Sequence, residues 1–160
     1  MRRLVPDLAA MGPEHLDRLE YLDACVSEAM RLKPVAPFLG LETLCDTRVA
    51  DVDVPAGTVV WCVMRHGSLD DRHFPNVGAF DPQRWLSGAD KRMSMPFGSG
   101  PRICPGRYLA LLEIKMAMAM LLGSFEVESV APLDGGEAQE VMGFTMNPVA
   151  LRMRLRNIRP

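Results

Sequence analysis

The feature that most constrains this chain is an apolar helix that directly follows a turn rich in glycine and proline. In the predicted helix 106–122, apolar residues such as Leu109 and Met116 occur on nearly every side. A helix that is apolar all round is normally buried, so the fold must place other elements against it. Glu113 and Lys115 interrupt the apolar run, which is too short and too charged to span a membrane.

Hydrophobic periodicity predicts a second helix and a β-rich segment ahead of this one. Apolar residues recur at helical spacing from Leu16 to Leu32. Pro34 ends this helix, because proline disfavours helical backbone in the residue before it. Residues 39–65 have the composition of strands, and Pro55-Ala56-Gly57 predicts the turn of a hairpin within them.

The rest of the chain is predicted as one long irregular segment and two strands. Residues 67–96 show no sustained period, and a loop of that length in a compact domain needs something to hold it in place. Phe125–Val130 is predicted to be a strand. In residues 151–156 arginines alternate with apolar residues, which indicates a half-buried strand with one solvated face or, alternatively, a basic docking stripe.

Composition excludes several classes of protein. The chain has 160 residues, of which 18 are basic and 20 acidic, with a net charge of −2. A general nucleic-acid binder needs a marked basic excess, and an apolar content of 48% excludes a disordered chain. Residues 1–10 hold no apolar run long enough for a signal peptide. We therefore expect a soluble, cytoplasmic chain without a membrane segment and without a nucleic-acid partner.

The four cysteines are widely spaced and form no CxxC pair. Neither a zinc site nor a disulfide framework is therefore expected. Cys25 and Cys62 lie in apolar periodic segments and are predicted to be small buried side chains. Cys45 lies in a polar stretch with no such pattern, whereas Cys104 differs from all three because of its neighbours.

Cys104 stands just before the apolar helix, in the segment Phe97-Gly98-Ser99-Gly100-Pro101-Arg102-Ile103-Cys104-Pro105-Gly106. A thiol at the start of a helix faces free backbone N–H groups and the positive end of the helix dipole, and both favour the metal-binding thiolate. Gly98 and Gly100 let the backbone approach a flat ligand, and Arg102 offers a planar cation to a carboxylate. Haem with an axial cysteinate suits this set. A cysteine in such a turn is also commonly inert.

The same residues resemble the haem-binding signature of the cytochrome P-450 haem-thiolate monooxygenases. The six fixed positions of that signature are occupied by Phe97, Gly100, Arg102, Cys104, Gly106 and Ala110. The resemblance implies haem b as cofactor, held by these residues and Gly98, with Cys104 as the ligand of the iron. It also implies a mainly α fold with small β-sheets, comprising the C-terminal part of the family's fold from its ExxR helix to the helix after the cysteine.

Two weaker motifs occur in the order expected of this family. Glu28-Ala29-Met30-Arg31 resembles the ExxR helix motif, although such a pair alone is also an ordinary surface pair. Phe80–Trp85 resembles the PERF-type segment, with a glutamine where glutamate is usual. The resemblance implies that Glu28, Arg31 and Arg84 form a buried ion network, which would hold the long irregular segment under the haem.

The resemblance also implies contacts with substrate and with the haem propionates. Phe38 and Leu39 correspond to the segment that crosses the edge of the active site, and Phe144 lies in a turn that provides a second contact. Plain core packing is the alternative for both phenylalanines. Many members carry a propionate-binding arginine near Leu41; its absence here leaves Arg102 as the propionate partner.

The resemblance covers residues from about 16 to 156, and only the C-terminal part of the family's domain. It implies that residues 1–160 form the haem-ligand portion, without the N-terminal portion and the oxygen-binding helix. The parent reaction inserts one oxygen atom into a small organic substrate with electrons from a ferredoxin or reductase, and we expect it to be impaired in this chain alone. The alternatives are a truncated, non-enzymatic haem-thiolate module and a fragment that needs an N-terminal partner. In each case one face of helix 106–122 should be exposed and apolar.

Overall fold

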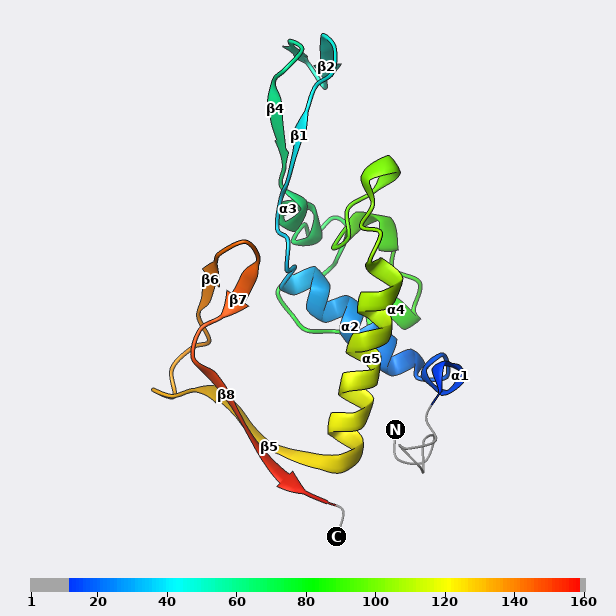
Figure 1. Ribbon diagram of the computed structural model, residues 1–160, viewed down its shortest axis with the longest axis vertical. Helices are drawn as coiled ribbons and strands as arrows, with labels where there is room; N and C mark the ends of the chain where they lie inside the picture. The colour runs from blue at the N-terminus through cyan, green and yellow to red at the C-terminus, as the bar shows by residue number, and fades with distance from the viewer. Residues whose placement is uncertain (1–11, 159–160) are drawn as a thin grey trace.

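The computed structural model describes residues 12–158, and its body is built from three helices (Figure 1). The short α1 (Pro13–Leu16) leads into α2 (Glu20–Leu32), and α5 (Arg107–Ser124) packs against both. The continuous helix predicted from Leu16 to Leu32 is therefore wrong at its start, because a turn over residues 17–19 separates α1 from α2. The predicted end before Pro34 is confirmed.

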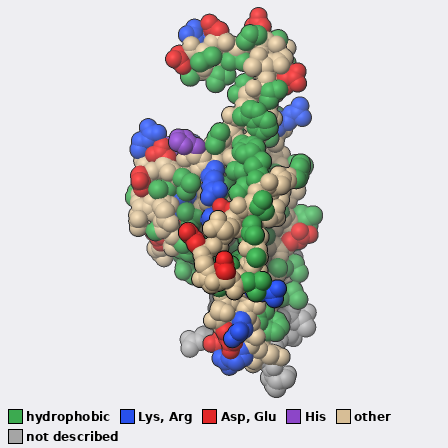
Figure 2. Space-filling view, turned by 90° about the vertical axis from the view of Figure 1, so that its left-hand side faces the viewer, with side chains coloured by type: hydrophobic (Ala, Val, Ile, Leu, Met, Phe, Trp, Pro, Cys, Tyr) green, Lys and Arg blue, Asp and Glu red, His purple; other side chains and the backbone are tan. Residues whose placement is uncertain are grey.

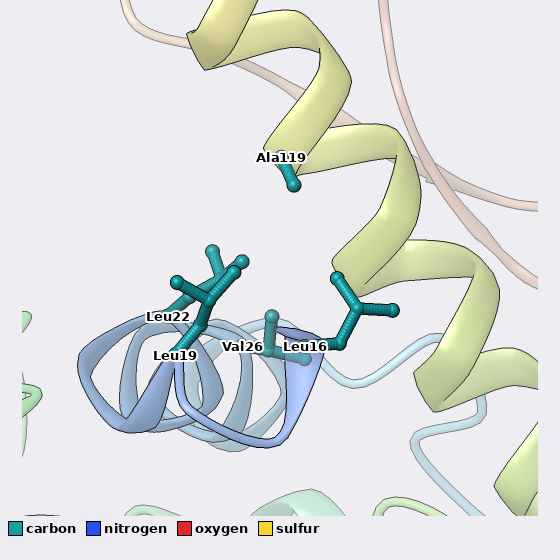
Figure 3. Packing of buried hydrophobic residues seen from close by; sticks show 5 residues of the cluster. All are labelled: Leu16, Leu19, Leu22, Val26 and Ala119. Carbon is teal, nitrogen blue, oxygen red and sulfur yellow. The ribbon is translucent and has the colours of Figure 1, made fainter. Parts of the chain in front are cut away.

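The apolar stripe of the first two helices forms the main hydrophobic core with α5. Figure 3 shows its five buried members, which are Leu16, Leu19, Leu22, Val26 and Ala119. Ala119 is the one fully buried residue of α5, so the prediction of a helix buried on all sides is wrong. Since α1 and α2 cover a single side of α5, Leu109 and Met120 on another side remain 59% and 52% exposed. The expected exposed apolar face is therefore present.

The segment predicted as irregular contains short helices and a second hydrophobic cluster. α3 (Met64–Ser68) begins in the range predicted as strands and ends within this segment, while α4 (Gln83–Leu86) and the 3₁₀ turn η1 (Lys91–Met93) lie inside it. Phe74 is completely buried and its ring centroid lies 5.7 Å from that of Trp85 in α4. These two rings pack with Ala24 of α2, so the segment is attached to the helical body by apolar side chains as well as by polar ones.

A narrow two-stranded arm extends away from the helices (Figure 1). Within it β1 (Leu39–Glu42) pairs with β4 (Val59–Cys62), and β2 (Thr47–Val49) pairs with β3 (Val52–Val54), both antiparallel. The hairpin predicted around residues 55–57 is therefore wrong, because the strands on either side of that turn pair with other partners. Figure 2 shows apolar side chains along the arm and charged ones at its tip. Since no further layer covers the arm, Cys62 is exposed, contrary to prediction.

The C-terminal part forms two more antiparallel pairs. β5 (Phe125–Pro132), predicted as 125–130, pairs with β8 (Leu151–Asn157), and β6 (Glu140–Met142) pairs with β7 (Met146–Pro148). Every residue of β8 is exposed, so the half-buried strand predicted for 151–156 is wrong. No layer of the described chain packs on either face of this pair, and Arg156 instead forms ion pairs with Glu126 and Glu128 of β5.

The architecture is thus a helical body with four two-stranded sheets in the described residues, in agreement with the predicted α+β class with small sheets. Among residues 12–158, no helix is both long and apolar enough to cross a membrane.

Candidate functional site

The loop before α5 presents Cys104 on a main chain that is fixed on both sides. The N–H of Cys104 donates to the carbonyl of Phe97 at 2.9 Å, and the N–H of Arg107 donates to the carbonyl of Cys104 at 3.2 Å. The loop is therefore closed on itself by the bond between its ends. The Cys104 thiol is exposed and is not part of a disulfide, so it can meet a ligand from outside the loop.

Two glycines give this loop its shape. Gly98 and Gly100 have φ angles of +73° and +68°, in the left-handed region that favours glycine. A Cβ at Gly100 would meet no described atom within 4 Å, and one at Gly98 would meet only Arg102 O, at 3.9 Å. The backbone conformation, and not crowding by the chain itself, therefore requires glycine at these positions. The outer side of the loop is left open.

The residues around the thiol fit a flat, largely apolar group that carries carboxylates. Arg102, at the end of the 3₁₀ turn η2 (Gly100–Arg102), is exposed two residues before the cysteine. A Cβ on Gly106 would lie 3.8 Å from the Cys104 sulfur, so glycine keeps that side of the sulfur clear. Ala110 follows one turn later, its N–H bonded to Gly106 O at 2.9 Å. One sulfur donor, one guanidinium and small residues match the chemistry that haem requires.

A separate cavity of about 350 Å³ lies between this loop and α2. Phe97, Gly98 and Ile103 line it from the loop, and Met30 lines it from α2. Cys104 is not among the described residues that line it, so this cavity is not where the thiol would meet a ligand. Phe97 and Gly98 thus line this cavity and also belong to the cysteine loop.

The structure brings Glu28, Arg31 and Arg84 together in the interior. Glu28 and Arg31 are both 0% exposed, and the two Glu28 oxygens accept bonds from Arg31 Nε at 2.9 Å and Nη2 at 2.8 Å. Arg84 Nε donates to Glu28 Oε1 at 3.1 Å. Two further donors complete the shell of the carboxylate, namely Trp85 Nε1 at 2.9 Å and the N–H of Asp81 at 3.0 Å.

Arg31 also holds the main chain of the irregular segment. Its guanidinium donates to the carbonyl of Ser68 at 2.8 Å, to that of Val77 at 2.8 Å and to that of Ala79 at 3.2 Å. Its carbon Cζ lies 5.1 Å from the centre of the Phe74 ring, a cation–π arrangement. The ion network therefore fixes the path of a segment that has little regular structure of its own.

The charge balance of this network is uneven. Burial alone raises the pKa of Glu28, but the hydrogen bonds from Arg31, Asp81 and Trp85 outweigh burial and lower the pKa to about 2. The carboxylate therefore stays ionised, yet it faces two guanidinium groups. Arg84 Nη2 is buried and has no hydrogen-bond partner among the described residues, while Arg84 Nη1 donates to Pro75 O at 3.1 Å.

Part of this network could not be predicted from the sequence. The indole of Trp85 was not expected as a donor to Glu28, although the residue follows Arg84 directly. The carbonyls of Ser68, Val77 and Ala79 carry no signal in the sequence, since every residue has one. Adjacency to Arg84 was the one available indication of the role of Trp85.

The residues expected at the edge of the active site lie on two different elements. The Phe38 ring packs edge-on against Trp61 of β4, with ring centroids 5.4 Å apart, and Leu39 is half-buried at the start of β1. Phe144 is fully exposed in the turn between β6 and β7. Core packing therefore does not account for Phe144, and the half-buried Phe38 packs against the 61% exposed Trp61 outside the two hydrophobic clusters of the described residues.

Comparison with known proteins assigns the chain to a family. The family model described as Cytochrome P450 matches residues 2–154. The chain belongs to the cytochrome P450 family. A relative from Drosophila melanogaster, "Probable cytochrome P450 4d20", is 31% identical over 150 residues, covering 91% of this chain and 29% of the relative. The human "25-hydroxyvitamin D-1 alpha hydroxylase, mitochondrial" is 40% identical over 116 residues, covering 71% of this chain and 23% of the relative.

Solved cytochrome P450 structures share the fold. The crystal structure of a cytochrome P450 named CYP102L1 superposes with a TM-score of 0.82 and 28% identity, covering 98% of this chain and 36% of that one. The cytochrome P450DA heme domain gives a TM-score of 0.84 at 24% identity, covering 99% and 36%. The chain thus spans less than a third of the length of these two curated relatives, 29% and 23%, and 36% of each P450 structure.

Proposed function

We propose that this chain is the haem-ligand portion of a single cytochrome P450 domain, with Cys104 as the axial thiolate of haem b. Membership of the family supports the cofactor. The observation that carries the choice of ligand is the exposed Cys104 thiol on a loop closed by the bond between Cys104 N–H and Phe97 O.

In this proposal each of these loop residues has a specific role in binding the haem. Haem bound through a cysteinate favours O–O cleavage and so supplies the chemistry of oxygen insertion. Cys104 donates the sulfur, and Arg102 pairs with a propionate. The small residues Gly106 and Ala110 leave space for the haem, and Phe97 and Gly98, which also line the cavity, belong to the part of the loop that holds it.

In the same proposal the buried ion network stabilises the structure around the haem-binding loop. Glu28, Arg31 and Arg84 hold the segment that leads from α3 to the cysteine loop, and so fix the position of the sulfur. Phe38, Leu39 and Phe144 contact the substrate. That substrate is a small organic molecule, and a ferredoxin or reductase delivers the electrons, as in the family at large.

A second candidate is a haem-thiolate module that is inactive alone and pairs with another polypeptide segment. The exposed apolar face of α5 favours it, since Leu109, Met116 and Met120 are 59%, 37% and 52% exposed. Patches of this kind commonly mark contact surfaces. Turnover of an organic substrate by the isolated chain would exclude this candidate.

Carbon monoxide binding tests the ligand assignment. The chain, loaded with haem and reduced, should give a strongly red-shifted Soret band in the carbon monoxide difference spectrum, and Cys104→Ser should abolish the shift. Cys62→Ser is the matched control, because Cys62 is also exposed and free. A red-shifted band that survives Cys104→Ser would contradict the assignment of the ligand.

A further inference from the structure

Three segments that are distant in the sequence meet beside the end of α2. The N–H of Met146 in β7 donates to Val35 O at 2.8 Å, and the N–H of Arg65 in α3 donates to Pro37 O at 3.1 Å. The segment that precedes Phe38 is thus bonded on one side to the C-terminal hairpin β6–β7 and on the other to α3. Both bonds are between main-chain groups and fix the position of this segment.

Glu140 joins the same three segments through its side chain. Its Oε2 accepts from Lys33 Nζ at 2.9 Å and from Arg65 Nη2 at 3.3 Å. The side chains of Glu140 and Arg65 are only 21% and 29% exposed, so solvent screens this pair less than an ordinary surface pair. We call Lys33, Arg65 and Glu140 the Glu140 clamp. The hydrogen bond from Lys33 is the main cause of the lowered pKa of Glu140, so its carboxylate is charged at neutral pH.

The Glu140 clamp holds one strand of the hairpin that carries Phe144, and the main-chain bond from Met146 to Val35 holds the other. Glu140 is the first residue of β6 and Met146 is the first residue of β7. Phe144 lies in the turn between these strands, while Phe38 follows directly after Pro37, whose carbonyl Arg65 binds. Arg65 therefore contacts both sides of the junction, through its main-chain N–H at Pro37 O and through its guanidinium at Glu140.

We propose that Glu140 is a positioning residue that sets the separation of the two substrate-contact segments, and thereby the size of the substrate that fits between them. This inference rests on the proposed function, because it takes Phe38 and Phe144 as substrate contacts. Without the negative charge, Lys33 and Arg65 would repel each other across the junction, and the hairpin would move away from the segment before β1.

Hydrogen exchange tests the clamp without any need for haem. In Glu140→Gln the amide of Met146 should exchange roughly tenfold faster, the factor that corresponds to about 1.4 kcal/mol, while exchange in α2 and α5 stays unchanged. Glu137→Gln is the matched control, since it removes an exposed carboxylate three residues earlier. Glu140→Asp, which keeps the charge, should restore part of the protection. Equal exchange at Met146 in wild type and Glu140→Gln would overturn the clamp.

Azole titration of the haem-loaded chain tests the role in size selection. Imidazole is small, whereas 4-phenylimidazole carries a ring that must fit between the substrate-contact segments. Glu140→Gln should change the ratio of the two dissociation constants by roughly tenfold, equivalent to about 1.4 kcal/mol, and Glu137→Gln should leave the ratio unchanged.

The two measurements separate the possible failures. If wild type binds both azoles and Glu140→Gln keeps their ratio, the role in size selection is wrong even when the exchange rate changes. If wild type takes up no haem or shows no azole spectrum, the proposed function fails and the role in size selection fails with it. The exchange data then still decide whether Glu140 fixes the junction.

Discussion

Replacing Glu28 by glutamine should cost about 4 kcal/mol of folding free energy, since breaking a buried ion pair costs about 3–5 kcal/mol. In the structure this carboxylate accepts five hydrogen bonds, from Arg31, Arg84, Trp85 and the N–H of Asp81. Glutamine keeps the shape and one acceptor oxygen, but it leaves two guanidinium groups without a counter-charge.

The pKa of Glu28 gives an independent magnitude for the same interaction. The shift from 4.5 to about 2 corresponds to about 3 kcal/mol in favour of the charged form, at about 1.4 kcal/mol per pKa unit. Both figures thus place the contribution of the Glu28 charge at about 3–4 kcal/mol. Because small domains are stable by about 5–15 kcal/mol, the substitution removes a large share of the total.

Urea denaturation followed by tryptophan fluorescence measures this loss. Trp85 is 9% exposed and Trp61 is 61% exposed, so a Trp61→Phe background makes the buried indole beside Glu28 the single reporter. With a typical denaturant slope of about 2 kcal/mol per molar urea, the midpoint should fall by roughly 2 M. Glu113→Gln, at an exposed position of α5, should change the stability by less than about 0.5 kcal/mol. A loss below about 1 kcal/mol in Glu28→Gln would refute the view that its charge compensates the buried guanidinium groups.

Four further outcomes follow from the same structure. The stabilisation by Glu28 should be complete above pH 4.5 and decline as the pH falls towards 2, because its pKa is lower in the folded chain than in the unfolded one; urea midpoints of wild type and Glu28→Gln should therefore converge in acid, and a constant difference would contradict this. Arg31→Met should cost about 2 kcal/mol more than Arg84→Met in urea unfolding, since Arg31 makes five hydrogen bonds and losing one charge-assisted bond costs about 1.5–3 kcal/mol. Removing Arg84 also removes the buried Nη2 that has no partner among the described residues; equal costs would count against this asymmetry. Gly100→Ala should cost about 1–2 kcal/mol through its φ of +68° alone, so a neutral effect on the urea midpoint would argue against the left-handed conformation. Met116→Lys, at a 37% exposed position of α5, should reduce aggregation measured by light scattering without lowering the urea midpoint; unchanged scattering would mean that this face does not drive association.

The helices could be predicted from the sequence because their apolar residues follow a single period. The core residues Leu16, Leu22 and Val26 all lie on the predicted stripe. The extent to which α5 is buried could not be predicted in this way. A helix that is apolar on all sides does not reveal which other elements of the described chain pack against it. Leu109 is as apolar as Leu16, yet it is 59% exposed.

Strand pairing in the arm was mispredicted for a physical reason. Pro55-Ala56-Gly57 does form a turn, with a Gly57 φ of +78°, but turn chemistry alone does not decide which strands pair. Residue 50, an alanine with a φ of +54°, turns the chain between β2 and β3 although alanine rarely adopts that conformation. No local signal in the sequence marked this position.

For the candidate site, the sequence indicated the residues that lie in motifs and missed both the carbonyls that act through the main chain and the side chains of Trp85 and Glu140. Cys104, Arg102 and Glu28 were predicted from the motifs in which they occur. Glu140 was missed because it lies in a polar stretch without a motif, 107 residues from its partner Lys33. Contacts over such separations leave no trace in a single sequence.

The way in which Arg31 and Arg84 hold the irregular segment has a consequence for how this chain can change by mutation. Both guanidinium groups bind carbonyl oxygens, which every amino acid possesses, at positions 68, 75, 77 and 79. Most side chains of that segment can therefore be exchanged while the path of its backbone stays the same; Phe74, at 0% exposed, is an exception. Substitutions at exposed positions of this stretch, such as His73, can thus alter the surface of the chain while the backbone keeps its path.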